Sequence, residues 1–161
     1  EGLADLWVLR VVVLGGGAAG EGASYYEWTR VPCAGAKARA FHSATLVGRG
    51  RWLLLCGGLG DAHSREDADV VDVEGWRWAG AMEGVCPPGG SAGHFAAWVE
   101  CRSTLLLGGG CGRPAGVGML DKYHGTVTLR ELSFGPAGDG PPQLAAAGAA
   151  PPPPPGAAPS T

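Results

Sequence analysis

Short apolar runs recur along the first 134 residues, and each of the three clearest runs ends at a glycine. The runs cover residues 6–14, 52–56 and 104–107, and the glycines are Gly15, Gly57 and Gly108. Short runs of aliphatic and β-branched residues bounded by glycine favour buried strands over helices. The pattern therefore predicts an all-β chain in which glycine marks the strand ends.

The central part of the chain has the most complete pattern. It predicts four strands, at residues 42–47, 52–56, 69–73 and 76–79, with a tight turn at 48–51 and a charged loop at 61–67. Gly and Arg at 48–51 suit a hairpin turn. This stretch is therefore expected to form one four-stranded sheet.

The same order recurs on both sides of the central unit. After it, strands are predicted at residues 93–98, 104–107, 119–123 and 126–132, the last two as third and fourth strands. Before it, residues 6–14 and 25–31 form a partial unit, because only ten residues separate Gly17 from Trp28. His42 and His94 lie 52 residues apart, a spacing typical of β-propeller repeats.

The expected fold is a partial β-propeller of about three four-stranded blades within residues 1–134. The units cover about residues 1–32, 39–82 and 93–134. Residues 135–161 are almost all Gly, Pro and Ala, with prolines at 151–155, and this tail is predicted to be disordered with polyproline II character.

The central unit resembles the kelch repeat family. The residues that carry the resemblance are Arg39, His42, Ser43, Thr45, 53–58, 71–73 and Trp76 or Trp78, and in the next unit Gly93, His94, 105–109, Leu120 and Asp121. The resemblance implies a propeller that acts as a protein-interaction module, an adaptor or scaffold without enzymatic activity. It assigns a structural role to the repeat positions His42, Gly57, Gly58, Trp76, His94, Gly108 and Gly109.

Three blades do not close a ring, since about four is the minimum. A chain that starts at Glu1 is accordingly expected to be a fragment of a larger protein, or to self-associate through unpaired blade edges. Marginal stability is expected for the same reason.

Two enzymatic alternatives remain open. Gly15, Gly17 and Gly20 have the G-x-G-x-x-G spacing of a NAD- or FAD-binding oxidoreductase, but no acid follows between Glu27 and Asp61 to bind a ribose. The other alternative is an oxidase or sugar-modifying enzyme on a kelch propeller. No copper-site constellation of that kind is found in the sequence, and no cofactor is predicted.

The best partner-binding residues lie just after glycine stops, where loops leave a rigid scaffold. They are Asp61, His63, Arg65, Glu66, Asp67 and Arg113. Metal binding by the acidic residues and His63 is disfavoured because a short charged loop is ordinarily solvated. Catalysis by Ser43 with His42 or His94 is disfavoured because no partner acid lies nearby in the sequence.

Charge and cysteine content narrow the class of partner. Lys and Arg total 12 against 15 Asp and Glu, giving a net charge of −3, which argues against nucleic acid and anionic membranes. The five cysteines contain no C-x-x-C pair, and Cys56 is expected to be buried, although a Cys101–Cys111 disulfide stays open. A protein partner and an intracellular location, cytoplasmic or nuclear, are expected.

Overall fold

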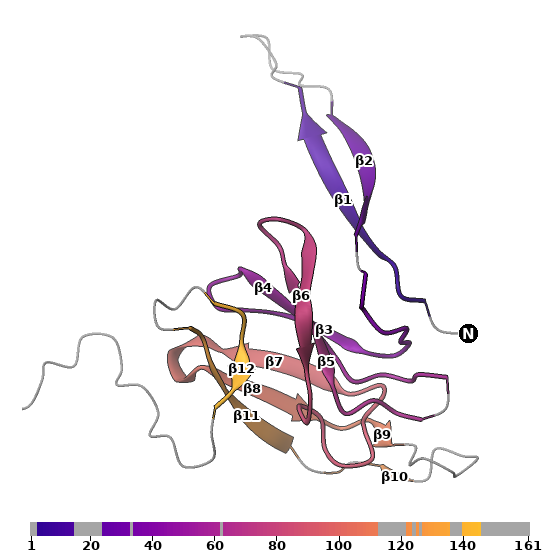
Figure 1. Ribbon diagram of the computed structural model, residues 1–161, viewed down its shortest axis with the longest axis vertical. Coiled ribbons are helices and arrows are strands. Elements are labelled where there is room, and N and C mark those ends of the chain that lie inside the picture. Colours follow the sequence, from indigo (N-terminus) through magenta and orange to yellow (C-terminus); the bar gives the residue numbers. More distant parts are fainter. Residues whose placement is uncertain are drawn as a thin grey trace, which may run out of the picture.

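The computed structural model describes residues 3–14, 24–32, 34–61, 63–112, 122–123, 125, 127–135 and 140–145. Within these residues the chain is built from antiparallel strands, which confirms the predicted all-β class (Figure 1). The one helical element among them is a three-residue 3-10 turn, η1 (Glu100–Arg102). In the described part of the chain, no helix could therefore cross a membrane.

The first sheet is a four-stranded meander in sequence order. It consists of β3 (Ser43–Val47), β4 (Trp52–Cys56), β5 (Ala68–Asp72) and β6 (Arg77–Met82). Buried and part-exposed residues alternate along β4, as expected for a strand with one face in the core. The register of β5 against β6 shifts between Val70 and Val71, where a bulge interrupts the pairing. The four strands predicted for this part of the chain are present.

The second sheet is also four-stranded, with strand order β12-β11-β8-β7. It consists of β7 (Phe95–Val99), β8 (Thr104–Gly108), β11 (Val127–Ser133) and β12 (Gln143–Leu144). In the sequence between β8 and β11, β9 (Cys111–Gly112) and β10 (Lys122–Tyr123) pair with each other as a separate two-stranded sheet.

Two predictions for this sheet are wrong. The strand at residues 127–133 is the third strand and not the fourth, because it pairs directly with β8. The fourth strand comes from residues 143–144, inside the stretch predicted to be a disordered tail. Leu132 pairs with Leu144, and Leu144 packs against the core, so this short segment is ordered by tertiary contact despite its composition.

The first predicted unit contains two described strands, β1 (Leu6–Val13) and β2 (Ser24–Val31). They pair along their full length as an antiparallel ribbon. The ribbon projects away from the two sheets, and its strands contact chiefly each other (Figure 1). A single bridge, Leu3 to Arg39, links the segment before β1 to the entrance of the first sheet.

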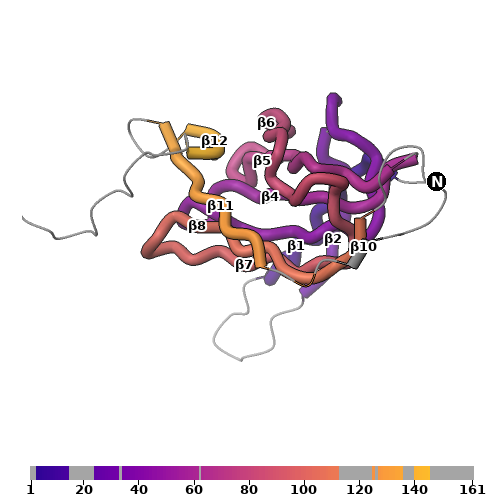
Figure 2. The backbone as a smooth tube through the Cα atoms, turned by 90° about the horizontal axis from the view of Figure 1, so that it is seen from below, coloured from indigo at the N-terminus to yellow at the C-terminus, as the bar shows by residue number. Residues whose placement is uncertain are grey.

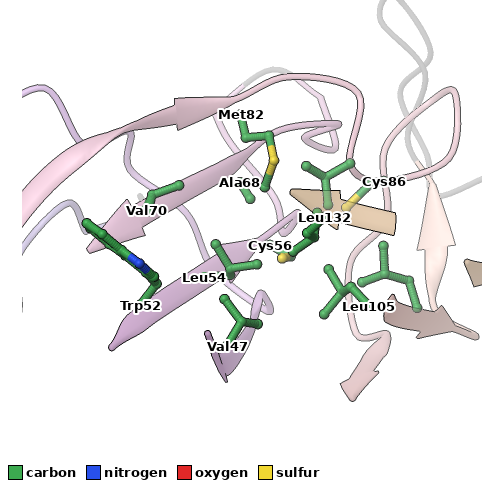
Figure 3. Packing of buried hydrophobic residues seen from close by; sticks show 12 residues of the cluster. Val47, Trp52, Leu54, Cys56, Ala68, Val70, Met82, Cys86, Leu105 and Leu132 are labelled. Atoms are coloured by element: carbon green, nitrogen blue, oxygen red, sulfur yellow. The ribbon is translucent and has the colours of Figure 1, made fainter. Parts of the chain in front are cut away.

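The hydrophobic core lies between the two sheets. Figure 2 shows the second sheet stacked beside the first, and β3 contacts β7 along the seam. Figure 3 shows the side chains that meet there. The cluster contains Val47, Trp52, Leu54, Cys56, Ala68, Val70, Met82, Val85, Cys86, Leu105, Leu107 and Leu132.

The buried tryptophan of this core is Trp52, which is 4% exposed, whereas Trp76 and Trp78 are half-buried. The kelch resemblance rested on Trp76 or Trp78 and gave Trp76 the structural role in this unit. Trp76 instead lies in a turn with a φ of 46°, where its backbone geometry keeps it out of the core. In the second sheet, Trp98 of β7 and Phe134, the residue after β11, form an edge-to-face pair with ring centroids 5.9 Å apart.

The two sheets repeat each other with an offset of 52 residues. The bounds of β3 and β7, and those of β4 and β8, differ by that number. A bridge from Ala40 to Leu59 in the first sheet has its counterpart, at the same offset, in the bridge from Ala92 to Cys111. The matching stretches therefore share their fold in detail.

Candidate functional site

The loop after β4 begins with two glycines that the backbone requires. Gly57 has a φ of 59°, and a Cβ placed on it would lie 2.4 Å from the carbonyl oxygen of Ser91. Gly58 has a φ of 92°, and its Cβ would lie 2.6 Å from the carbonyl oxygen of Ala40. These positions combine positive φ with close backbone approach, two conditions that favour glycine. The chain can turn sharply here and lead into the charged loop.

The equivalent pair in the second sheet is Gly109 and Gly110, which have φ values of 69° and 82°. The sequence pattern matched Gly108 and Gly109 to this position, which is one residue early. Gly108 is instead the last residue of β8, where a Cβ would lie 2.4 Å from a ring carbon of Phe95. Gly57 and Gly58 are therefore matched to the second sheet by the 52-residue offset, and not by the first glycine of the run at residues 108–110.

A hydrogen bond joins the two sheets beside the glycine turn. Ser43 Oγ and His94 Nε2 lie 2.8 Å apart, and His94 is buried while Ser43 is half-buried. His42, at the matching position of the first sheet, is exposed. The contact connects the start of β3 with the segment that leads into β7. Its position in the seam gives the pair a structural function.

A buried ion network fastens residues 37–39 to the first sheet, where β4 ends and β5 begins. Arg39 is 5% exposed, and its guanidinium donates to Asp69 Oδ2 at 2.7 Å and to the carbonyl oxygen of Gly57 at 2.8 Å. Asp69 is also buried, and its other oxygen accepts a hydrogen bond from the indole of Trp78 at 3.3 Å. Charges with this little solvent contact require such partners.

Asp67 extends the network toward the surface. Its carboxylate lies 2.5 Å from Lys37 Nζ, 3.5 Å from the Arg39 guanidinium and 3.7 Å from that of Arg65. Burial alone would raise the pKa of Asp67, but the hydrogen bond from Lys37 and the three positive charges hold that pKa below its usual value. The hydrogen bonds to Asp67 and Glu83 raise the pKa of Lys37. Both groups are therefore charged at neutral pH.

The predicted partner-binding residues differ in burial. Asp61, His63 and Glu66 are exposed, Arg65 is half-buried, and Asp67 is buried. The expectation that Asp67 belongs to a solvated loop is therefore wrong, because the surrounding cations draw it inward. Arg113 lies outside the described residues.

An open depression of about 230 Å³ lies over the outer side of the network. It is lined by Lys37, His63, Arg65, Glu66, Asp67 and Glu83. Glu83 is exposed and holds Lys37 at 3.1 Å, while Glu66 accepts a hydrogen bond from the Gly89 backbone at 2.7 Å. The depression thus has a fixed floor of paired charges and a rim of exposed polar side chains.

Sequence reasoning missed Lys37 and Glu83 as members of this surface. Lys37 contacts Asp67 and Glu83 across 30 and 46 residues of sequence. Pairs of that separation leave no local pattern. One sequence signal could have pointed to Lys37. Lys37 and Arg39 are the only charged residues between Arg30 and Arg49, and they lie directly before the first strand of the central unit.

The metal and nucleotide alternatives have little geometric basis. Among the described residues, no group of three or more His, Cys, Asp or Glu side chains is placed to hold a metal ion. Gly15, Gly17 and Gly20 lie outside the described residues. The chain that follows them is the strand β2, paired with β1, where a dinucleotide site requires a helix.

The described cysteines are unpaired, including Cys101 and Cys111. Cys56 and Cys86 are both in the core, and burial raises the pKa of the Cys86 thiol to about 12. The expectation that Cys56 is a buried small side chain is confirmed.

Compared with models of protein families and with curated proteins, the sequence matches none.

Proposed function

We propose that this chain is a segment of a kelch-type β-propeller and that it binds a protein partner through the depression beside the loop at residues 61–67. The observation that supports the propeller is the pair of successive four-stranded meanders whose first strands, β3 and β7, contact each other. In a propeller the first strands of neighbouring blades line the central axis. Two or three blades do not close a ring, so further blades come from the same polypeptide or from a second one.

The binding surface follows from the way in which the loop is held. The Arg39–Asp69 and Lys37–Asp67 pairs fix its base. His63 and Glu66 remain exposed on the rim of the depression, and Asp61 is exposed at the start of the loop. A loop whose base is already fixed loses little backbone freedom on binding. The exposed carboxylates of Asp61, Glu66 and Glu83 favour a partner surface that carries basic residues. The module performs no chemistry of its own.

The test compares three forms of the full chain in affinity capture with quantitative mass spectrometry. The loop variant is Asp61→Lys with His63→Lys, which places positive charge where the proposed partner is basic, and the control is Glu131→Lys, an exposed acid on β11. We expect partners that the wild type and the control retain and that the loop variant loses. With a purified partner, titration is expected to show that the loop variant raises the dissociation constant about tenfold or more.

Two results would count against this proposal. One is an unchanged set of partners for the loop variant. The other is saturable binding of NAD or FAD to the purified chain, which would favour the nucleotide-binding alternative. Circular dichroism of each variant serves as the folding control, since all three should have the spectrum of an all-β protein.

A further inference from the structure

The β1–β2 ribbon has two chemically different faces. Cross-strand partners share a face, and the register pairs Leu9 with Trp28 and Val11 with Tyr26. The face that contains these pairs, here named the aromatic face, consists of Trp7, Leu9, Val11, Val13, Tyr26 and Trp28. All six are exposed, with Trp28 at 62% and Tyr26 at 68%. Within the two strands, Arg30 and Ser24 are the polar residues on this face, one at each end.

The opposite face is polar at its centre. Arg10 pairs with Glu27 in the register, and their charged atoms lie 3.8 Å apart. Thr29 and Tyr25 belong to the same face, and so do four aliphatic residues that are half-buried or buried: Leu6, Val8, Val12 and Val31. The exposed ion pair is compatible with water, and the aliphatic side chains of this face are less exposed than those of the aromatic face, so this face has less need of a cover. The contrast indicates that the aromatic face is the one suited to a contact.

In the described residues, nothing packs over the apolar side chains of the aromatic face. A two-stranded hairpin is at best marginally stable by itself and needs a further layer over its apolar face. Neither sheet supplies that layer, because β1 and β2 contact chiefly each other and project away from the sheets (Figure 1). The cover must therefore come from a second molecule or from residues that the structure does not describe.

The exposed area matches what a dimer needs. With full side-chain areas of about 150–250 Å² for residues of this size, the aromatic face offers roughly 700 Å² per chain. Two such faces in contact would bury roughly 1,400 Å², within the range of about 1,200–2,000 Å² for stable interfaces. A surface without central charges can also face a copy of itself, since a two-fold contact places like residues together without repulsion.

We propose that the aromatic face is a self-association surface whose occupant is the same face of a second copy of this chain. Two ribbons stack face to face as a four-stranded sandwich, with Tyr26 and Trp28 of each chain at the centre and Arg30 at the rim. Aromatic residues enriched at a contact centre are typical of interface hot spots. This contact is independent of the loop at residues 61–67 and of the propeller assignment.

Sedimentation equilibrium of the full chain over a concentration series tests the proposal. The key variant is Tyr26→Lys and its matched control is Tyr25→Lys, the same substitution one residue away on the opposite face. We expect a wild-type dimer, a dissociation constant raised about tenfold or more by Tyr26→Lys, and a near wild-type constant for Tyr25→Lys. Far-UV circular dichroism establishes that both variants keep their strands.

Three outcomes would overturn the proposal. The wild type could sediment as a monomer at all concentrations, or the two tyrosine variants could weaken the dimer equally. Alternatively, deletion of residues 146–161 could abolish the dimer while Tyr26→Lys does not, which would assign the contact to the proline-rich segment. A dimer that survives the deletion and is lost in Tyr26→Lys supports the stacked ribbons.

Discussion

The Oγ atom of Ser43 and the Nε2 atom of His94 lie 2.8 Å apart and so tie the start of β3 to the entry of β7. Because His94 is 8% exposed, water cannot easily replace a lost partner. The contact therefore bears on how firmly the two sheets are held together.

Ser43→Ala is expected to lower the free energy of unfolding by about 1–2 kcal/mol, the cost of leaving a buried polar group with one partner fewer. Urea denaturation followed by tryptophan fluorescence measures the change. Ser133→Ala, at an exposed position on β11, should stay within about 0.5 kcal/mol of the wild type. Equal effects of the two substitutions would show that the seam does not depend on this bond.

Gly57→Ala is expected to cost about 3 kcal/mol or more, because the new Cβ adds a steric collision with Ser91 to left-handed backbone strain. Gly109→Ala separates the two effects. Gly109 occupies the equivalent position with a similar φ, yet nothing lies within 4 Å of its Cβ position. Its substitution should cost about 1 kcal/mol. Thermal unfolding of the two variants gives the difference, and a Gly109→Ala cost as large as that of Gly57→Ala would remove the steric explanation.

Arg39→Met is expected to lower the free energy of unfolding by about 3–5 kcal/mol, because it leaves the buried carboxylate of Asp69 without its cation. The double variant Arg39→Met with Asp69→Leu should recover part of this loss, since no uncompensated charge remains there. Chemical denaturation of the wild type, the two single variants and the double variant gives the coupling energy. Additive losses would mean that the pair is not coupled.

The lowered pKa of Asp67 predicts acid sensitivity with a definite sign. The folded state binds the proton more weakly than the unfolded chain, whose carboxyl titrates near pH 4, so the contribution of Asp67 is complete above that pH and is lost as the pH falls below it. Asp67→Asn should make the urea midpoint less dependent on pH between about pH 5 and pH 2. Asp61→Asn, at an exposed position, is the control and should retain the wild-type dependence.

Thiol labelling is expected to distinguish the cysteines by burial. Cys101 is exposed and should react with a maleimide within minutes, whereas Cys56 and Cys86, both in the core, should be labelled only after unfolding. Peptide mapping by mass spectrometry reads each site separately. Rapid labelling of Cys56 in native buffer would contradict the described core.

The local pattern was enough to predict most of the strands. Residues 52–56 form a strand with the predicted bounds because an apolar run between a glycine-containing turn and a glycine pair leaves few alternatives. The exposed position of Asp61 and the burial of Cys56 follow from the same pattern. These features depend on neighbours in sequence.

Features that depend on distant neighbours were not predicted. Asp67 and Asp61 belong to the same charged loop, and contact with Lys37 and Arg39, 30 and 28 residues away, explains why Asp67 is buried. Gln143 and Leu144 become a strand because β11 offers an unpaired edge, which composition does not reveal. The choice of Trp52 over Trp76 as the core tryptophan likewise depends on how the two sheets meet.

The 52-residue correspondence between the sheets stops just after Cys111, where the second sheet inserts β9 and β10 before its third strand and the first sheet has only the short charged loop. The same framework thus accepts connections of very different length at one corner without loss of strand order. The connection between the second and third strands is therefore a suitable site for inserted sequence. An affinity epitope or a designed binding loop inserted there would be displayed by the scaffold, with its recognition altered independently of its stability.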